Sequence, residues 1–462
     1  GKGILNTLQK HGAVFGKEIN AYTSFDETVY MLDNIPIKDG LVDTCLTVLH
    51  DWSNYLLLTD EEIDAERGVI KEEWRTRQNG RMRLYQTSLP ITYNNSKYAN
   101  RLPIGLMTIV DNFEYKALRD FYHDWYRTDL QAIAIVGDID VEEIEQKIKQ
   151  KFSKIPAVKN PRERFVVDIP DNKEMMYSLG MDPEISTASL SFGIRHKKPQ
   201  NMHNVGELKQ QLLEKIAISL LNVRISDKSL EPEAPFLKGN TSFGSIARTS
   251  NAFGVTVKPK QGKQQQAFTA VLTEVLRAVK FGFTSSEIKR AIKGFTKGYE
   301  FQISQIDNKP HFMIIRSIQN NYLENMAITD IEKEYELVKQ LLREITAEDY
   351  HNTIKRFYAK GNRYLNVPGV KGNSNLTEEQ ALQIISKVEN DPGITAYEDK
   401  VEDRTLFSSV KSKKGAISVT KENKVLGATT YTLSNGIKVH YKFTDKEDNR
   451  VSLDAISPGG FS

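Results

Sequence analysis

Two sequence patterns occur twice in the chain, in the same order, and this repetition constrains the fold more than any other feature. Residues 58–63 (LTDEEI) are matched by residues 283–288 (FTSSEI). Residues 121–137 run from Phe-Tyr through Arg to an apolar stretch and a glycine, and residues 357–369 do the same. A repeated order of motifs indicates a duplicated unit of helices and strands.

Hydrophobic periodicity predicts an α+β fold with two such units. For the first unit it predicts an extended stretch at 13–34, a strand at 131–136 and helices at 3–11, 40–57, 59–85, 112–126 and 141–154. For the second unit it predicts strands at 165–168, 187–194, 243–257 and 363–367, and helices at 205–222, 264–280, 284–303 and 346–358. Prolines and charges at 160–172 separate the two units.

The last part of the chain has a different character. A helix is expected at 376–389, and residues 391–427 are charged and without periodicity, as in a linker. Residues 430–441 alternate around Ser434-Asn435-Gly436, which predicts a β-hairpin. We therefore divide the chain into a first domain (1–165), a second, homologous domain (166–375), a helix with a linker (376–427) and the first strands of a further part (428–462).

Composition excludes several classes of protein. The 63 Lys and Arg residues nearly balance the 60 Asp and Glu residues, so there is no basic field to attract nucleic acid. Apolar stretches such as 130–137 are far shorter than the ~18 residues of a membrane-spanning helix, and we expect no span. Cys45 is the only cysteine, which excludes an intrachain disulfide and a cysteine zinc cluster. Because it lies on an apolar helix stripe, we expect it to be buried rather than nucleophilic.

The helix predicted at 59–85 places two acids in an unusual position. Thr59 and Glu62 have the spacing of a capping box, which marks the start of the helix. Glu66 and Glu73 lie between apolar residues, in the sector that should be buried, and are separated by roughly 10.5 Å along the axis. Buried carboxylates need a cation, a metal or several donors to compensate them. The alternative is that both acids lie at a wet edge or pair with Arg or Lys.

Other catalytic patterns are absent from the sequence. No two of the eight histidines lie three to five residues apart, so no helix face presents a histidine pair to zinc. The sequence contains no G-x-S-x-G, no P-loop and no G-x-G-x-x-G. The chain by itself therefore has no complete catalytic constellation.

Several segments together resemble the pitrilysin/insulinase family of zinc metallopeptidases, the inverzincins. The matching segments, in order, are 20–30, Glu66 to Glu73, 121–140 and 432–439. The resemblance implies two homologous domains, each a mixed, mostly antiparallel sheet with helices packed on it. Together they would form one half of a clamshell that closes around an unfolded peptide.

The resemblance also implies roles for individual residues. Glu73 corresponds to the third zinc ligand of the family, and Glu66 to an additional acidic residue beside the site. Asn20 and Ala21 correspond to an edge strand that pairs with the substrate main chain. The family's H-x-x-E-H helix, which carries two zinc ligands and the catalytic base, is absent and would lie upstream of Gly1.

We therefore expect a fragment of a zinc endopeptidase that hydrolyses unfolded peptides, and we expect the fragment alone neither to hold zinc nor to cleave. Its partners would be the peptide and the missing second half of its own chain. The rival hypothesis is a non-catalytic scaffold or peptide-binding member of the same family. An unrelated α/β binding protein would require the matching segments to be coincidence. The chain begins without Met, so either a leader was removed, which would be consistent with a bacterial periplasm, or the chain starts within a longer protein.

Overall fold

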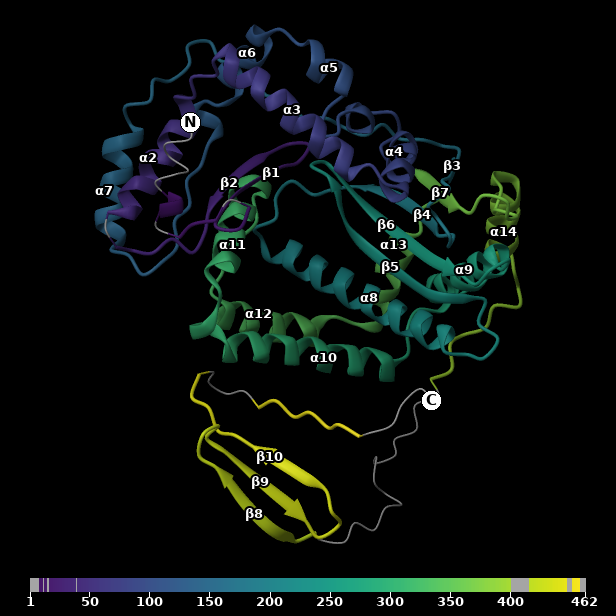
Figure 1. Cartoon of the computed structure of the whole chain (residues 1–462). Helices are drawn as coiled ribbons and strands as arrows, with labels where there is room; N and C mark the ends of the chain where they lie inside the picture. Colours follow the sequence, from purple (N-terminus) through teal and green to yellow (C-terminus); the bar gives the residue numbers. More distant parts are fainter. Residues whose placement is uncertain are drawn as a thin grey trace. The chain divides into compact units, whose positions relative to one another are not determined.

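The computed structural model describes residues 8–10, 12–14, 16–38, 40–399, 415–446 and 451–457 (Figure 1). The chain divides into two compact units, Gly1–Phe295 with Pro310–Tyr397 and Thr296–Lys309 with Glu398–Ser462. Most of the helix predicted at 3–11 lies outside the described residues, although residues 8–10 are helical. None of the helices in the described ranges combines the length and the apolar content that crossing a bilayer requires.

The larger unit begins with a two-stranded hairpin that packs on helices. Strands β1 (Ile19–Thr23) and β2 (Thr28–Leu32) pair antiparallel with each other along their whole length. Ile19 is buried with Leu41 and Val48, which fixes the hairpin on the first of the following helices. These helices are α2 (Leu41–Asn54), α3 (Asp60–Arg77), α4 (Gly80–Thr92), α5 (Met107–Asn112), α6 (Tyr115–Trp125) and α7 (Val141–Phe152).

The single helix predicted at 59–85 is wrong, because the structure contains two helices, α3 and α4. The break falls at Gln78 and Asn79, both of which have extended backbone angles. The side chain of Asn79 accepts a hydrogen bond from the main chain of Met82 at 3.0 Å and so begins α4. Asparagine is a preferred residue for starting a helix, which explains why the chain turns here.

Residues 131–136 do not form the predicted strand in the described structure. An apolar run cannot form a strand alone, because its N–H and C=O groups need a neighbouring strand as partner. Strands β1 and β2 pair only with each other. The side chain of Gln131 instead donates to the main-chain oxygen of Ser53 at 2.9 Å.

A five-stranded sheet lies at the centre of the larger unit, in the order β3-β7-β4-β6-β5. Only the β3–β7 pair is parallel, so the sheet is mixed and mostly antiparallel, which confirms the predicted α+β class. Its strands are β3 (Met176–Met181), β4 (Leu190–Lys197), β5 (Phe236–Ala247), β6 (Ser250–Pro259) and β7 (Arg363–Gly369). The strand predicted at 165–168 does not form, and β3 occupies the edge of the sheet beside β7.

Aromatic side chains join this sheet to its helices. The ring of Phe192 on β4 lies 6.1 Å from that of Phe268, and the ring of Phe253 on β6 lies 5.5 Å from that of Phe357. All four side chains are buried, and such residues supply much of the apolar area that stabilises a core. The helices concerned are α9 (Gln264–Phe281) and α13 (Ala347–Phe357), while α8 (Val205–Ser229) packs on β5 of the same sheet.

Gly193 of β4 lies opposite Tyr364 of β7, and a Cβ on Gly193 would lie 2.1 Å from Cζ of that buried ring. We expect Gly193→Ala to lower the free energy of unfolding by about 1–3 kcal/mol, because the ring has to move. Gly244→Ala in β5 is the matched control, since its new Cβ would meet no atom within 4 Å. Chemical denaturation measures both variants. An equal loss for both would show that glycine's backbone freedom, and not the ring, sets the cost.

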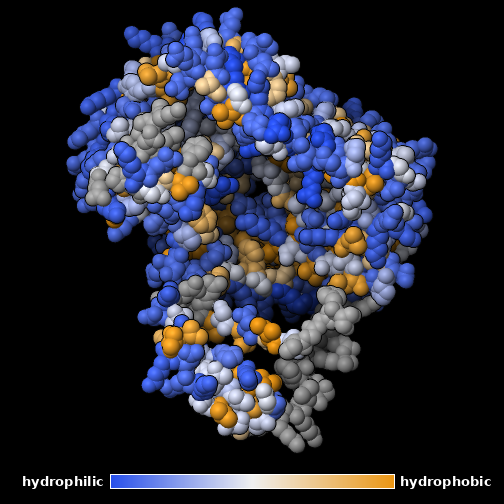
Figure 2. All heavy atoms as spheres, in the orientation of Figure 1, coloured by the Kyte–Doolittle hydropathy of each residue, from blue (hydrophilic) through white to orange (hydrophobic). Residues whose placement is uncertain are grey.

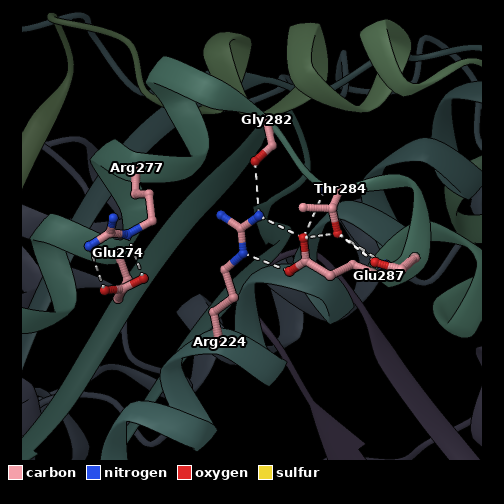
Figure 3. Close-up of polar contacts among 7 residues, drawn as sticks. Arg224, Glu274, Arg277, Gly282, Thr284 and Glu287 are labelled. Atoms are coloured by element: carbon pink, nitrogen blue, oxygen red, sulfur yellow. Dashed lines mark hydrogen bonds and ion pairs between the residues drawn. The ribbon is translucent and has the colours of Figure 1, made fainter. Parts of the chain in front are cut away.

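A buried ion pair joins α8 to the start of α10 (Ser285–Ser304) (Figure 3). The Nε and Nη2 atoms of Arg224 donate to Glu287 at 2.7 and 2.8 Å, and Nη2 also donates to the oxygen of Gly282 at 3.0 Å. The two side chains are only 1% and 4% exposed. Thr284 and Glu287 also bond reciprocally, at 2.8 and 3.3 Å, so the second copy of the repeated T-x-x-E pattern forms a capping box.

The ends of α6 and α13 have matching backbone geometry. The residues that follow them, Tyr126 and Tyr358, have nearly the same backbone angles: φ −90° and ψ 66° in one, φ −90° and ψ 61° in the other. A glycine comes eleven residues later in both cases, at Gly137 and Gly369. The backbone angles align Tyr358 with Tyr126, four residues after Tyr122, which the Phe-Tyr pattern had aligned with it. In this alignment residues 131–136 correspond to β7.

After α14 (Glu378–Glu389), residues 391–397 are fixed on α8 and α9. Lys280 donates to the main-chain oxygen of Asp391 at 2.8 Å, and Arg277 to that of Thr395 at 2.5 Å. The guanidinium of Arg224 lies 4.2 Å from the centre of the Tyr397 ring. The first residues of the predicted linker are thus held in place by three cationic side chains.

The remaining elements complete the two units. Two helices without a counterpart in the sequence predictions connect α10 to α13, namely α11 (His311–Glu324) and α12 (Ile331–Glu344). The smaller unit holds an antiparallel sheet of β8 (Ile417–Asn423), β9 (Ala428–Leu433) and β10 (Lys438–Tyr441). The hairpin predicted at 430–441 is confirmed as β9–β10, and Gly436 has a φ of 86°, which glycine adopts readily. β8 lies within residues 391–427, which the sequence predicted to be a linker without regular structure.

Candidate functional site

The two predicted acidic residues lie on α3, whose ends follow from its local sequence. The side chain of Thr59 accepts from the main chain of Glu62 at 3.3 Å, as the capping spacing predicted. Acidic residues occupy the first turn, and Arg75 and Arg77 the last. Both placements are favourable in the dipole of the helix.

Glu66 and Glu73 are not buried, and this part of the prediction is wrong. Glu66 is exposed and has no hydrogen-bond or ion-pair partner among the described residues. Glu73 is 38% exposed and pairs with Arg77 of the same helix at 2.6 Å. Val69 and Trp74 are also exposed, so no described element covers this sector. The alternative of a wet edge with an arginine partner describes the structure better.

The other side of α3 is fixed by Arg67 and Lys71. Arg67 donates to the main-chain oxygens of Val110 and Phe113, the latter at 2.8 Å, and its guanidinium carbon lies 3.9 Å from the centre of the Phe113 ring. Lys71 pairs with Asp111 at 2.8 Å. These contacts hold α3 on α5 while the side with Glu66 and Glu73 remains open. The surface over α3, α5 and α6 is mostly hydrophilic, with scattered apolar side chains (Figure 2).

Tyr115, at the start of α6, adds a third attachment to α3. Its hydroxyl donates to Asp64 at 2.6 Å, and Arg67 donates to the same carboxyl at 3.0 Å. These hydrogen bonds hold the pKa of Asp64 below its usual value. The carboxylate therefore stays charged and continues to accept both bonds in mildly acidic solution.

Asn20 and Ala21 lie at the open edge of β1. Alternate residues of an antiparallel pair turn their main-chain groups toward the partner strand. The N–H of Ser24 donates to the main-chain oxygen of Glu27 across the turn, so the even-numbered residues of β1 bond to β2. The main-chain groups of Ala21 and Thr23 therefore point away from β2. The N–H of Ala21 donates to the side-chain oxygen of Asn20 at 2.9 Å. The oxygen of Ala21 and both main-chain groups of Thr23 have no partner among the described residues. Both residues are exposed, so the edge is open to another strand.

The described residues do not form a zinc site. Among them, no three His, Cys, Asp or Glu side chains are grouped so that they could hold a metal. His50 pairs with Asp51 at 3.0 Å and stacks on Tyr55. No histidine within the described ranges joins Glu73 in a group that could hold a metal. Zinc in proteins takes three or four nitrogen, sulfur or oxygen ligands. Glu66 and Glu73 alone do not fit this requirement.

Cys45 packs beside the core that contains Ile19, Leu41 and Val48. Burial raises the pKa of its thiol to about 11. A thiol with so high a pKa is almost entirely protonated at neutral pH and is a poor nucleophile. The predicted packing role is confirmed.

Two sequence profiles of one peptidase family match the chain. The profile described as Insulinase (Peptidase family M16) matches residues 1–102, and the profile described as Peptidase M16 inactive domain matches residues 112–295. The chain belongs to the insulinase family of peptidases, M16. The resemblance found in the sequence is thereby confirmed.

Curated relatives in the insulinase family extend the match over the whole chain. The probable zinc protease PqqL of Haemophilus influenzae is 28% identical over 466 residues, which cover 99% of this chain and 49% of that protein. The probable zinc protease PqqL of Escherichia coli is 27% identical and covers 100% of this chain and 49% of its own length. The chain therefore spans about half the length of these relatives.

Solved structures show the same fold. The periplasmic protease PqqL from Escherichia coli superposes with a TM-score of 0.80 at 24% identity, covering 97% of this chain and 49% of that one. A structure of the first half of the same protease gives a TM-score of 0.79 at 25% identity and covers 86% of both chains. The predicted fold, one half of a clamshell peptidase of the M16 family, is confirmed.

The structure leaves the predicted site residues in two separate groups. No hydrogen bond or ion pair among the described residues links the edge of β1 to Glu66 or Glu73. Sequence reasoning missed Thr23, although the two-residue period of a strand places it on the same edge as Ala21. It also missed Arg67, which lies inside the Glu66–Glu73 motif but bonds main-chain oxygens of a distant segment.

Proposed function

We propose that this chain is part of a zinc-dependent endopeptidase that hydrolyses unfolded peptides. The observation that carries the proposal is the open edge of β1, where Ala21 and Thr23 present main-chain groups to solvent. Main-chain pairing with an edge strand binds extended peptides with little regard to their side chains. Membership of the M16 family, and relatives named as zinc proteases, support this function.

In this proposal, Ala21 binds the substrate through its main chain and Asn20 through its side chain, because the main-chain groups of Asn20 face β2. Glu73 is one zinc ligand and Glu66 lies beside the metal. The position of Glu73 supports its role, because the carboxylate lies on the open side of α3 and is held only by a surface ion pair with Arg77. Such pairs contribute little free energy, so zinc can displace this one. Asn20 has to turn away from Ala21 before a peptide takes that N–H.

The remaining zinc ligands and the catalytic base are proposed to come from parts of the protein outside this chain. We propose that residues 1–165 and 166–375 are homologous domains, supported by the matching ends of α6 and α13. On this view 376–427 connects them to a second half that begins within 428–462. The Escherichia coli relative is described as periplasmic, which supports a bacterial periplasm as the location of this protein.

The decisive experiment compares the 462-residue chain with a protein that also carries the flanking segments its relatives possess. We expect the longer protein to bind one zinc per chain and to hydrolyse an unstructured peptide, because only it contains a complete ligand set. We expect the 462-residue chain to do neither. Zinc content by elemental analysis and peptide hydrolysis by mass spectrometry are the two measurements.

The second candidate is a non-catalytic, peptide-binding member of the family. The observation that favours it is the open edge of β1, because main-chain pairing with a peptide needs no metal. A folded longer protein that binds an unstructured peptide but contains no zinc and cleaves nothing would establish this second function. Cleavage that depends on zinc would exclude it.

A further inference from the structure

The turn between β1 and β2 is anchored at three successive residues. The ring of Phe25 packs edge-on against that of Tyr98 with centres 5.2 Å apart. The Tyr98 hydroxyl donates to both carboxylate oxygens of Asp26, at 3.0 and 3.1 Å. Glu27, the last residue of the turn, accepts a hydrogen bond from Arg248 at 2.6 Å. The first two anchors come from the same part of the chain as the hairpin, and the third comes from the central sheet.

Arg248 lies in the connection between β5 and β6 and joins three distant segments. Its Nη2 atom donates to Glu27, and its Nη1 atom donates to the main-chain oxygen of Leu323 at the end of α11. The Arg248 and Glu27 side chains are 12% and 21% exposed, so this ion pair is largely removed from water. Charge-assisted hydrogen bonds in such surroundings are among the stronger ones in proteins.

We propose that Arg248 is a positioning residue, which holds the β1–β2 hairpin so that the open edge of β1 can pair with an extended peptide. The inference rests on the proposed function, because it assigns the edge of β1 to the substrate. Arg248 touches neither that edge nor Glu73, and its effect passes through Glu27 and the turn.

The hairpin needs such an anchor because it has only two strands. An isolated two-stranded hairpin is marginally stable in water. In the middle of β2, Tyr30 forms a separate attachment: its hydroxyl bonds that of Tyr126 at 2.7 Å, and its ring lies 5.3 Å from that of Trp52. Loss of Arg248 therefore loosens the turn, which keeps its contacts with Tyr98, while β2 stays attached. Hydrogen bonds to a substrate strand require distances of about 2.7–3.2 Å, so a small displacement of β1 weakens them.

Amide hydrogen exchange on the 462-residue chain tests the anchor without reference to activity. In Arg248→Ala we expect the exchange of amides at 19–33 to accelerate by about tenfold or more, because one charged attachment of the hairpin is lost. The matched control is Arg277→Ala. Arg277 also binds a carboxylate, that of Glu274, and the Arg277 and Glu274 side chains are 20% and 9% exposed (Figure 3). Arg277 donates in addition to the main-chain oxygen of Thr395. We expect Arg277→Ala to leave amide exchange in the hairpin unchanged.

Kinetics on the longer protein test the consequence for substrate. We expect Arg248→Ala to raise KM for an unstructured peptide by about five- to tenfold and to change kcat by less than about twofold, because the pairing surface is disturbed and not the chemistry. Arg248→Lys should recover part of the loss, since an ammonium can still pair with Glu27. Arg277→Ala should change neither constant.

The outcomes separate this inference from the proposed function. Unchanged exchange in Arg248→Ala, or an equal acceleration in Arg277→Ala, overturns the inference. Accelerated exchange with an unchanged KM also overturns it, because the hairpin would then be anchored without consequence for the peptide. A longer protein that cleaves nothing contradicts the proposed function instead. In that case the affinity of Arg248→Ala for an unstructured peptide, compared with that of the unsubstituted protein, decides the role of Arg248.

Discussion

Replacing Arg224 with methionine is expected to lower the free energy of unfolding by about 3–5 kcal/mol. Arg224 and Glu287 are almost fully buried, and their two hydrogen bonds measure 2.7 and 2.8 Å (Figure 3). Methionine fills a similar volume but leaves the Glu287 carboxylate in the interior without its cation. Urea denaturation of the 462-residue chain, with the parent sequence beside it, measures the loss.

The double variant Arg224→Met/Glu287→Gln is the control for this prediction. Glutamine is uncharged and keeps an oxygen that can accept from Thr284, which Glu287 does at 2.8 Å. We expect it to recover most of the lost stability, because the unpaired buried charge is gone. A loss of less than about 1 kcal/mol in the single variant, within the range of an ordinary hydrogen bond, would contradict the assigned role of the pair.

The same pair predicts how stability depends on pH. Burial acts to raise the pKa of Glu287, but hydrogen bonds from Arg224 and Thr284 and the charge of Arg224 outweigh it, and the pKa is lowered. A lowered folded-state pKa contributes stability that is fully present above the unfolded value, about 4.3, and is lost as the pH falls through the folded value. In Arg224→Met burial prevails and the pKa rises. The difference between variant and parent should therefore shrink as the pH is lowered from 7.5 toward 5.

In the longer protein, Glu73→Gln is expected to lower zinc content and to reduce peptide hydrolysis by at least about 100-fold. The expectation rests on the proposed function. A neutral amide is a much weaker ligand for zinc than a carboxylate. The fold should be unaffected, because the Glu73 side chain is 38% exposed and its carboxylate pairs with Arg77 at the surface. Elemental analysis, peptide hydrolysis and circular dichroism measure the three properties.

Glu72→Gln is the control for Glu73→Gln. Glu72 is the preceding residue of the same helix and makes the same kind of surface pair, with Arg75 at 2.6 Å. It points away from the side with Glu66 and Glu73, so we expect neither zinc content nor hydrolysis to change. Retention of zinc and activity in Glu73→Gln would remove this residue from the metal site.

Local sequence predicted the parts of the fold that depend on near neighbours. The start of α3 at Thr59 and the β9–β10 hairpin with Gly436 follow from residues a few positions apart. The break between α3 and α4 was missed because the helical pattern continues across it and only Asn79 marks it. β3 was missed because Ser178 and Gly180 interrupt its apolar pattern, and its parallel pairing with β7 is set far along the chain.

The candidate site shows the same division between local and distant causes. Periodicity located Glu66 and Glu73 on one side of α3 but not their exposure, which depends on what packs against that side. The edge of β1 was expected from the resemblance to the family, whereas the alternation that would have added Thr23 is local to the strand. Arg248 could not, because its partners Glu27 and Leu323 lie 221 and 75 residues away in the sequence. Such contacts are set by the tertiary fold.

The hydrogen bond from Ala21 to the side chain of Asn20 has a consequence for how the protein behaves in concentrated solution. A strand edge that accepts a peptide also accepts another copy of the same chain, and such edges promote aggregation. Here β1 is five residues long, and its outward main-chain groups at Ile19 are already bonded to Val14 and Gly16. Ala21 and Thr23 remain, and the Ala21 donor is occupied by Asn20. A second copy gains little from so short a contact and has to displace Asn20 first. The hairpin thus limits self-association while its edge stays available.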